Sequence, residues 1–181
     1  MNNKNFSQIK EQKKLCDIRN SLNEIIDQQI NFNIDWIKKN NFAVVPIESS
    51  CHFNDEDANL IAKAIEYLSI NECYVCNPDK LGLYNECYQF EISKENILIL
   101  SSKFAHRNCV ILPENFSFVI LCTVEDYYLL CGTNNFVSIA VGGNILNAKK
   151  QFLDFALDKF WNKYDRDFFY NIYKKYEPFY G

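Results

Sequence analysis

The chain has 181 residues, of which 48% are hydrophobic, 15% aromatic and 23% charged. This length and apolar content fit a single domain over residues 1–181 and exclude a disordered or low-complexity chain. The net charge of −4 is concentrated in the middle: residues 41–150 carry 7 Lys or Arg against 13 Asp or Glu, whereas residues 1–40 carry 7 against 5 and residues 151–181 carry 5 against 5. This acidic middle disfavours nucleic acid as a partner and favours a basic protein, although an ordinary solvated acidic face explains it equally well.

No stretch approaches the roughly 18 consecutive apolar residues that a membrane span requires. The polar N-terminus also lacks the apolar core of a secretory signal. We therefore expect a cytoplasmic protein that does not contact a membrane. In a reducing compartment, its eight cysteines are expected to be mostly buried small hydrophobes or metal ligands rather than disulfides.

The N-terminal third predicts helices around one strand. Apolar residues recur at helical spacing over residues 6–31, and a further short turn is expected at residues 35–37. The apolar run 42–47 predicts a strand, which its proline places at a sheet edge or a strand end. Asn54 followed by acidic residues at 55–57 predicts the start of another helix, because an N-cap and negative charge both suit that position.

From residue 72 to residue 132 the apolar pattern changes to a period of two. This pattern predicts six strands, at residues 73–76, 87–92, 97–101, 109–112, 116–123 and 127–131. Turn residues separate these strands, among them Lys94-Glu95-Asn96 and Glu125-Asp126. The last two strands read as a tight hairpin. Because they are the most hydrophobic part of the chain, we place them at the centre of the sheet.

The C-terminal third predicts three helices, at residues 135–141, 145–164 and 168–176, the last stopped by Pro178. Its many aromatic residues could stack on nucleic acid bases, but the absence of net charge weakens that interpretation, and helical spacing assigns most of them to the core. The complete pattern predicts an α+β domain: N-terminal helices, a central mainly antiparallel sheet of about five or six strands, and C-terminal aromatic helices.

The best metal candidate combines Cys73-x-x-Cys76 with His106-x-x-Cys109, a spacing that suits a tetrahedral zinc ion. However, strand alternation points Cys73 and Cys76 to opposite faces unless the register bends. The alternative is a set of unliganded thiols. We predict no metal and no cofactor, and keep a zinc-stabilised protein as an alternative.

A thiol or serine nucleophile needs a base within reach, and the chain has only two histidines, His52 and His106. Cys51 or Ser50 with one of them defines a second alternative, a thiol- or serine-dependent enzyme. Against it, neighbouring residues on an extended strand point to opposite faces, and the segment lacks the glycines of a nucleophile elbow. Phosphate-binding glycine motifs are absent. We therefore predict that the protein is not an enzyme.

The hairpin segment Leu112–Gly132, followed by Phe136-Val137, Gly143 and the Ala148-x-x-x-Phe152 helix, covers about a quarter of the chain. It resembles small bacterial cytoplasmic proteins encoded beside toxin genes, including immunity proteins of contact-dependent growth inhibition and related polymorphic toxin systems. The resemblance implies a protein that binds and neutralises a toxin domain and has no catalytic machinery of its own.

The acidic middle and the implied function together define a predicted binding site for a basic toxin domain, such as a nuclease. The carboxylates expected to contact this partner lie near the hairpin and at the start of the second helix: Asp55, Glu56, Asp57, Glu125 and Asp126. Tyr127 is the expected aromatic anchor, because tyrosine is enriched at the centres of protein interfaces.

Overall fold

The computed structural model describes residues 6–49, 52–78 and 86–180. In these residues seven strands form one antiparallel sheet in the order β1-β4-β3-β5-β6-β7-β2. The strands are β1 (Phe6–Gln8), β2 (Ala43–Glu48), β3 (Glu72–Cys76), β4 (Cys87–Glu91), β5 (Cys109–Leu112), β6 (Phe118–Cys122) and β7 (Tyr127–Gly132). The helices are α1 (Gln12–Ile25), α2 (Ile34–Asn40), α3 (Asp55–Tyr67), α4 (Lys94–Lys103), α5 (Asn134–Ala140), α6 (Ile145–Ala156) and α7 (Lys163–Tyr176), followed by the 3-10 turn η1 (Glu177–Phe179). The predicted α+β class is confirmed, with more strands than expected.

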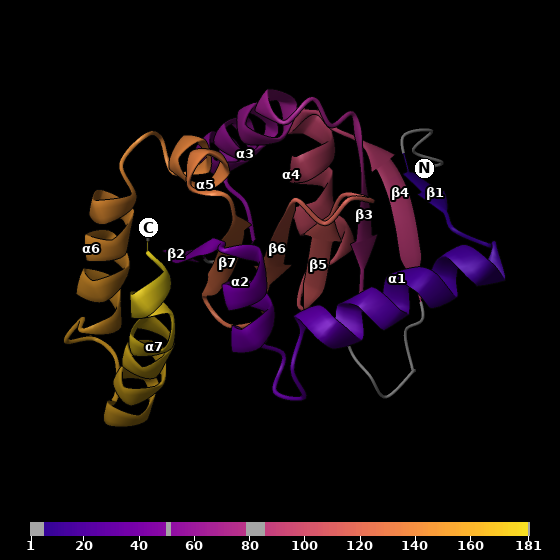
Figure 1. Cartoon of the computed structure of the whole chain (residues 1–181). Helices are drawn as coiled ribbons and strands as arrows, with labels where there is room; N and C mark the ends of the chain where they lie inside the picture. Colours follow the sequence, from indigo (N-terminus) through magenta and orange to yellow (C-terminus); the bar gives the residue numbers. More distant parts are fainter. Residues whose placement is uncertain (1–5, 50–51, 79–85, 181) are drawn as a thin grey trace.

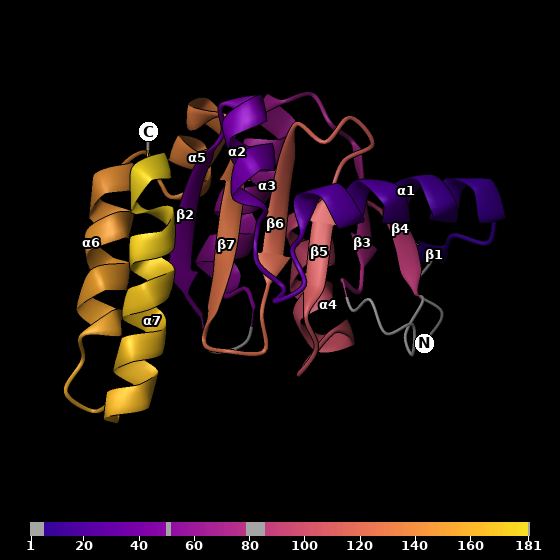
Figure 2. The ribbon, with the colours of Figure 1, turned by 60° about the horizontal axis from the view of Figure 1, so that its bottom comes forward.

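Helices cover both faces of the sheet (Figures 1 and 2). Helices α1 and α2 lie over one face, called the α1 face, where the Lys14 ammonium sits 4.8 Å from the centre of the Tyr74 ring. Helices α3, α4 and α5 lie over the other, called the α3 face, where the ring of Phe53 contacts that of Tyr128 at 5.1 Å. Helices α6 and α7 run side by side and pack on β2, which is an edge strand.

The three strands β5, β6 and β7 are buried along their whole length. Burial on both faces explains why their sequences are continuously apolar. The β6–β7 hairpin forms as predicted, but β5 and not the hairpin occupies the middle of the strand order. Pro46 lies in β2, which among the described strands pairs with β7 alone, so the expectation that this proline marks an edge is confirmed.

The predicted strand at residues 97–101 is wrong, because this segment belongs to helix α4. The Ser93 side chain caps the helix by accepting a hydrogen bond from Asn96 N at 3.1 Å, and Glu95 lies in the first turn. The residues that we interpreted as a turn are therefore a helix start. Ile97 and Leu100, at helical spacing, supply the buried face.

Two further boundaries differ from the prediction. Residues 6–8 form strand β1, paired with β4, ahead of a helix that begins only at Gln12. The single helix expected over 145–164 ends at Ala156, and a new helix begins at Lys163. Asn162 caps this helix, since its Oδ1 accepts hydrogen bonds from Tyr164 N at 2.8 Å and Asp165 N at 3.1 Å.

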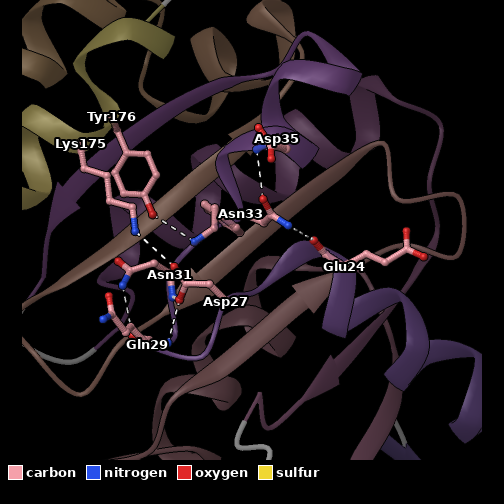
Figure 3. A network of polar contacts seen from close by, with 9 residues as sticks. Glu24, Asp27, Gln29, Asn31, Asn33, Asp35, Lys175 and Tyr176 are labelled. Carbon is pink, nitrogen blue, oxygen red and sulfur yellow. Dashed lines mark hydrogen bonds and ion pairs between the residues drawn. The ribbon is translucent and has the colours of Figure 1, made fainter.

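A polar network ties the α1–α2 loop to helix α7 (Figure 3). The hydroxyl of Tyr176 accepts a buried hydrogen bond from Phe32 N at 3.0 Å, and the Lys175 ammonium lies 3.3 Å from Asp27 Oδ2. The other oxygen of Asp27 accepts hydrogen bonds from the backbone N–H groups of Gln29 and Asn31. The network therefore holds the C-terminal helix against the α1 face by contacts far apart in sequence.

Candidate functional site

The predicted partner-binding carboxylates are on or near the surface. Asp55 and Glu56 are exposed in the first turn of α3, and Glu125 and Asp126 are exposed in the β6–β7 turn. Asp55 accepts a hydrogen bond from the Lys94 ammonium at 2.6 Å and is therefore already paired within the chain. Asp57 is half-buried.

Tyr127 is not the exposed anchor that the sequence suggested. Its side chain is 4% exposed, because position 127 points to the α1 face, where helices α6 and α7 cover it. Its ring lies 6.0 Å from that of Phe152 and 6.2 Å from those of Phe168 and Phe169. Tyr127 therefore packs beneath α6 and α7 and is not exposed on the surface.

The two most exposed aromatic residues of the described chain lie instead in and after the α6–α7 connection. Phe160 is 86% exposed and Tyr164 85% exposed, and Phe168 follows Tyr164 by one helical turn. Sequence reasoning missed them because the spacing continues the helical pattern of α6, although the helix stops before Phe160. The figures place this connection and the β6–β7 turn toward the same end of the molecule (Figures 1 and 2).

Carboxylates from three segments gather at this end. The pKa of Glu48, the last residue of β2, is raised by partial burial and by the charges of Asp126 and Asp158. Folding thus holds like charges close together. We call this region the acidic–aromatic surface, and it comprises Glu48, Val124, Glu125, Asp126, Leu157, Asp158, Phe160, Tyr164 and Phe168.

A small pocket of about 120 Å³ lies beside this surface, on the α3 face of the sheet. We call it the His52 pocket, and its lining comprises Ser49, His52, Ser101, Ala105, His106, Thr123, Val124 and Glu125. The two histidines predicted as possible bases therefore meet around one cavity. His106 is exposed at its rim, whereas His52 is only 7% exposed.

The loop after β2 fixes the position of His52. This residue has a φ of 68°, in the left-handed region that side chains rarely adopt. The Ser49 hydroxyl donates to the carbonyl oxygen of His52. The Ser101 hydroxyl of α4 accepts from Phe53 N at 3.1 Å and donates to Phe53 O at 3.3 Å. These bonds hold the loop against α4, and the Nε2 atom of His52 is buried without a hydrogen-bond partner.

A polar row on the α3 face beside this pocket begins with the side chains of Cys109, Cys122 and Tyr128. Strand register places Cys109 opposite Cys122, and Cys122 opposite Tyr128. The neighbouring Cys122 thiol and His52 lower the pKa of Cys109 although burial opposes the shift. Burial lowers the pKa of His52, but Cys109 and the backbone near Phe104 and Arg107 together outweigh it and leave that pKa raised. Each group therefore shifts the other toward its charged form.

The row ends at Asp57 of α3. Burial raises the pKa of this carboxyl, while hydrogen bonds from the backbone near Asn54 and from the Tyr128 hydroxyl act in the opposite direction. Asp57 Oδ2 is buried without a hydrogen-bond partner. Sequence reasoning attributed Asp57 to helix capping alone, and only the tertiary structure shows its contact with the sheet.

The alternative zinc set of Cys73, Cys76, His106 and Cys109 is not assembled. Strand alternation places Cys73 and Cys109 on the α3 face and Cys76 on the α1 face, while His106 is exposed in the loop before β5. Cys76 instead forms a disulfide with Cys87, so the expectation of free thiols is wrong for these two residues. Across residues 6–49, 52–78 and 86–180, no three His, Cys, Asp or Glu side chains are grouped so as to hold a metal ion.

Ser50 and Cys51, the candidate nucleophiles of the alternative enzyme hypothesis, lie outside the described residues. In the described part, no helix is both long and apolar enough to cross a membrane. Comparisons with protein-family models, with curated proteins and with solved structures find no match to this chain.

Proposed function

We propose that this chain is a non-enzymatic cytoplasmic immunity protein that binds and neutralises a basic toxin domain through its acidic–aromatic surface. The observation that carries the proposal is the exposure of Phe160 and Tyr164 next to Asp158, whose Oδ1 accepts a hydrogen bond from Phe160 N at 2.9 Å and whose charge acts on Glu48. Large apolar side chains exposed together and bordered by charge mark protein interaction sites.

The electrostatics of the surface support a basic partner. Partial burial raises the pKa of Glu48, and the charges of Asp126 and Asp158 raise it further, so the folded protein holds like charges close together. A cationic surface placed against these carboxylates would relieve that repulsion on binding, and complementary charge also accelerates encounter. The aromatic side chains would supply the apolar contacts that remain when salt screens the charges.

The test begins with capture of the partner by the tagged chain from its own host, followed by expression of that partner alone and together with the chain. We expect a stoichiometric basic protein that stops growth when expressed alone and does not when the chain is present. The double variant Glu125→Lys/Asp126→Lys should weaken the complex by about tenfold or more, mainly through slower association. Binding is measured by calorimetry or surface plasmon resonance at two salt concentrations.

The matched control is Glu66→Lys/Glu91→Lys, which makes the same change of charge with two exposed residues away from the surface. Strand register places Glu91 at the end of the sheet opposite the β6–β7 turn. This control should bind almost as well as the unmodified chain. A second variant, Phe160→Ala/Tyr164→Ala, should weaken the complex even in high salt. Equal affinity of all variants, or a partner without toxicity, would overturn the proposal.

A further inference from the structure

The polar row beside the His52 pocket suggests chemistry that an immunity function does not require. Cys109 and Cys122 are free, fully buried and directly opposite each other on neighbouring antiparallel strands. Directly opposed residues have Cα atoms roughly 4.5–5.5 Å apart, inside the range that a disulfide needs. Their side chains point to the same face of the sheet, so their sulfur atoms can bond without movement of the strands.

The structure contains an example of the same arrangement in the bonded state. Cys76 and Cys87 are also directly opposed on antiparallel strands, and their Cα atoms are 4.3 Å apart. The strand pairing of this fold is therefore compatible with a bond between facing cysteines. The pair Cys109 and Cys122 differs in having a histidine beside it.

The His52 pocket lies next to this pair, although both thiols are fully buried and neither of them lines it, so a reagent in the pocket reaches Cys109 only past the His52 side chain. His52 lines the pocket and also contacts Cys109, so it separates the cavity from the thiol. Exposed residues at the rim, among them His106 and Glu125, leave the pocket open to solvent. A cavity of about 120 Å³ exceeds by several times the roughly 10–15 Å³ that one water molecule needs, so a molecule of the size of hydrogen peroxide fits.

We propose that Cys109 and Cys122 are a peroxide-reactive dithiol that closes to a reversible cross-strand disulfide, with His52 as the proton carrier. The Cys109 thiolate attacks one peroxide oxygen, the O–O bond breaks, and the leaving hydroxide takes the proton of the His52 imidazolium. Cys109 is then a sulfenic acid, and one water has formed.

The second step closes the disulfide. Cys122 passes its proton to His52, which is now neutral, and its sulfur attacks the sulfur of Cys109. The S–O bond breaks, and the departing hydroxide takes the proton back from His52 as the second water. In total, two thiols and one hydrogen peroxide give one disulfide and two waters. The thiols lose two electrons and the peroxide gains them.

The test uses the full chain with Cys16→Ser and Cys51→Ser. The first change removes an exposed thiol, and the second removes a thiol that lies outside the described residues. Equimolar hydrogen peroxide at pH 7 should yield a peptide crosslink between Cys109 and Cys122, seen by mass spectrometry without reductant and lost with dithiothreitol. His52→Gln should slow its formation by about tenfold or more, because the thiolate loses its stabilising partner. His106→Gln, a change in the same pocket without contact to the thiols, should leave the rate unchanged.

Two further readouts separate chemistry from simple damage to the fold. Cys122→Ala should stop the reaction at a Cys109 sulfenic acid, which a dimedone probe labels. The rate for the unmodified pair should change little between pH 7 and pH 8, whereas in His52→Gln it should rise steeply toward the ordinary thiol pKa of about 8.5. Equal rates for the two histidine variants, or a crosslink that forms only in urea, would overturn the proposal.

Discussion

Two pairs of cysteines face each other at the same end of the sheet, one on each face, and only one pair is bonded. Cys76 and Cys87 form a disulfide on the α1 face, whereas Cys109 and Cys122 are free thiols on the α3 face. Both pairs join directly opposed residues of antiparallel strands, so register alone does not decide whether a bond forms. The neighbouring groups differ, since His52 contacts Cys109.

The same contrast separates the surroundings of the two pairs. On the α1 face, the contacts are structural: Tyr127 packs under α6 and α7, and the Tyr176 hydroxyl holds the α1–α2 loop. On the α3 face, the row from Cys109 to Tyr128 consists of groups that can exchange protons, next to an open pocket. We therefore expect changes on the α1 face to alter stability and changes on the α3 face to alter reactivity and pH dependence.

The largest effect should come from the α1 face. Reducing the Cys76–Cys87 bond, which closes a loop with a sequence separation of 11, should lower the free energy of unfolding. A loop of this size corresponds to about 3 kcal/mol in the chain-entropy view of disulfides. Urea unfolding with and without dithiothreitol measures the difference. The variant Cys76→Ser/Cys87→Ser should not respond to dithiothreitol. An unmodified chain that is equally stable in reductant would contradict the prediction.

A smaller effect on the same face is expected from Tyr176→Phe. The change leaves the buried Phe32 N–H without its 3.0 Å acceptor, which should cost about 1–2 kcal/mol of stability. Tyr164→Phe, at a position that is 85% exposed, should change stability by less than about 0.5 kcal/mol. Chemical denaturation gives both values. The rate of the Cys109–Cys122 reaction should be the same in both variants, and a slower reaction in Tyr176→Phe would show that the two faces are coupled.

Local patterns predicted much of the fold. Alternating or continuous apolar runs located β3, β5, β6 and β7, and Asn54 with its following acids located the start of α3. The failure at residues 97–101 shows the limit of such patterns. The alternating apolar residues favoured a strand there, but the Ser93 cap and the packing of Ile97 and Leu100 favour a helix. A strand preference that rests on a short run of alternating apolar residues is outweighed by a helix N-cap combined with tertiary contacts.

The candidate site was only partly predictable. The exposed carboxylates at 125 and 126 follow from turn chemistry, and the sequence identified the histidines as possible bases. It could not identify Cys109 as the neighbour of His52, because that contact depends on how the loop after β2 packs on α4. Tyr127 was misplaced for a related reason: the hairpin does not reveal which of its faces α6 and α7 will cover.

The smallest effect concerns Asp57 at the end of the polar row. Burial raises its pKa above the ordinary value of 3.8, so the folded protein binds this proton more tightly than the unfolded chain does. The contribution of Asp57 to stability therefore falls as the pH rises from about 4 through the raised pKa, and is constant above it. Asp57→Asn should remove that fall while keeping an oxygen for the Tyr128 hydroxyl.

The stability of Asp57→Asn relative to the unmodified chain should thus increase between pH 4 and pH 7, by less than about 1 kcal/mol because the side chain is only half-buried. Urea unfolding at the two pH values measures the change. Glu56→Gln removes a carboxylate from the same helical turn at an exposed position. Comparing the two variants therefore separates the effect of burial on the pH dependence of stability from the effect of the helix dipole. If both variants instead lose stability relative to the unmodified chain as the pH rises, the helix dipole outweighs burial at this helix start. The polar row would then end at Tyr128, and the α3 face would differ from the α1 face only at its cysteine pair.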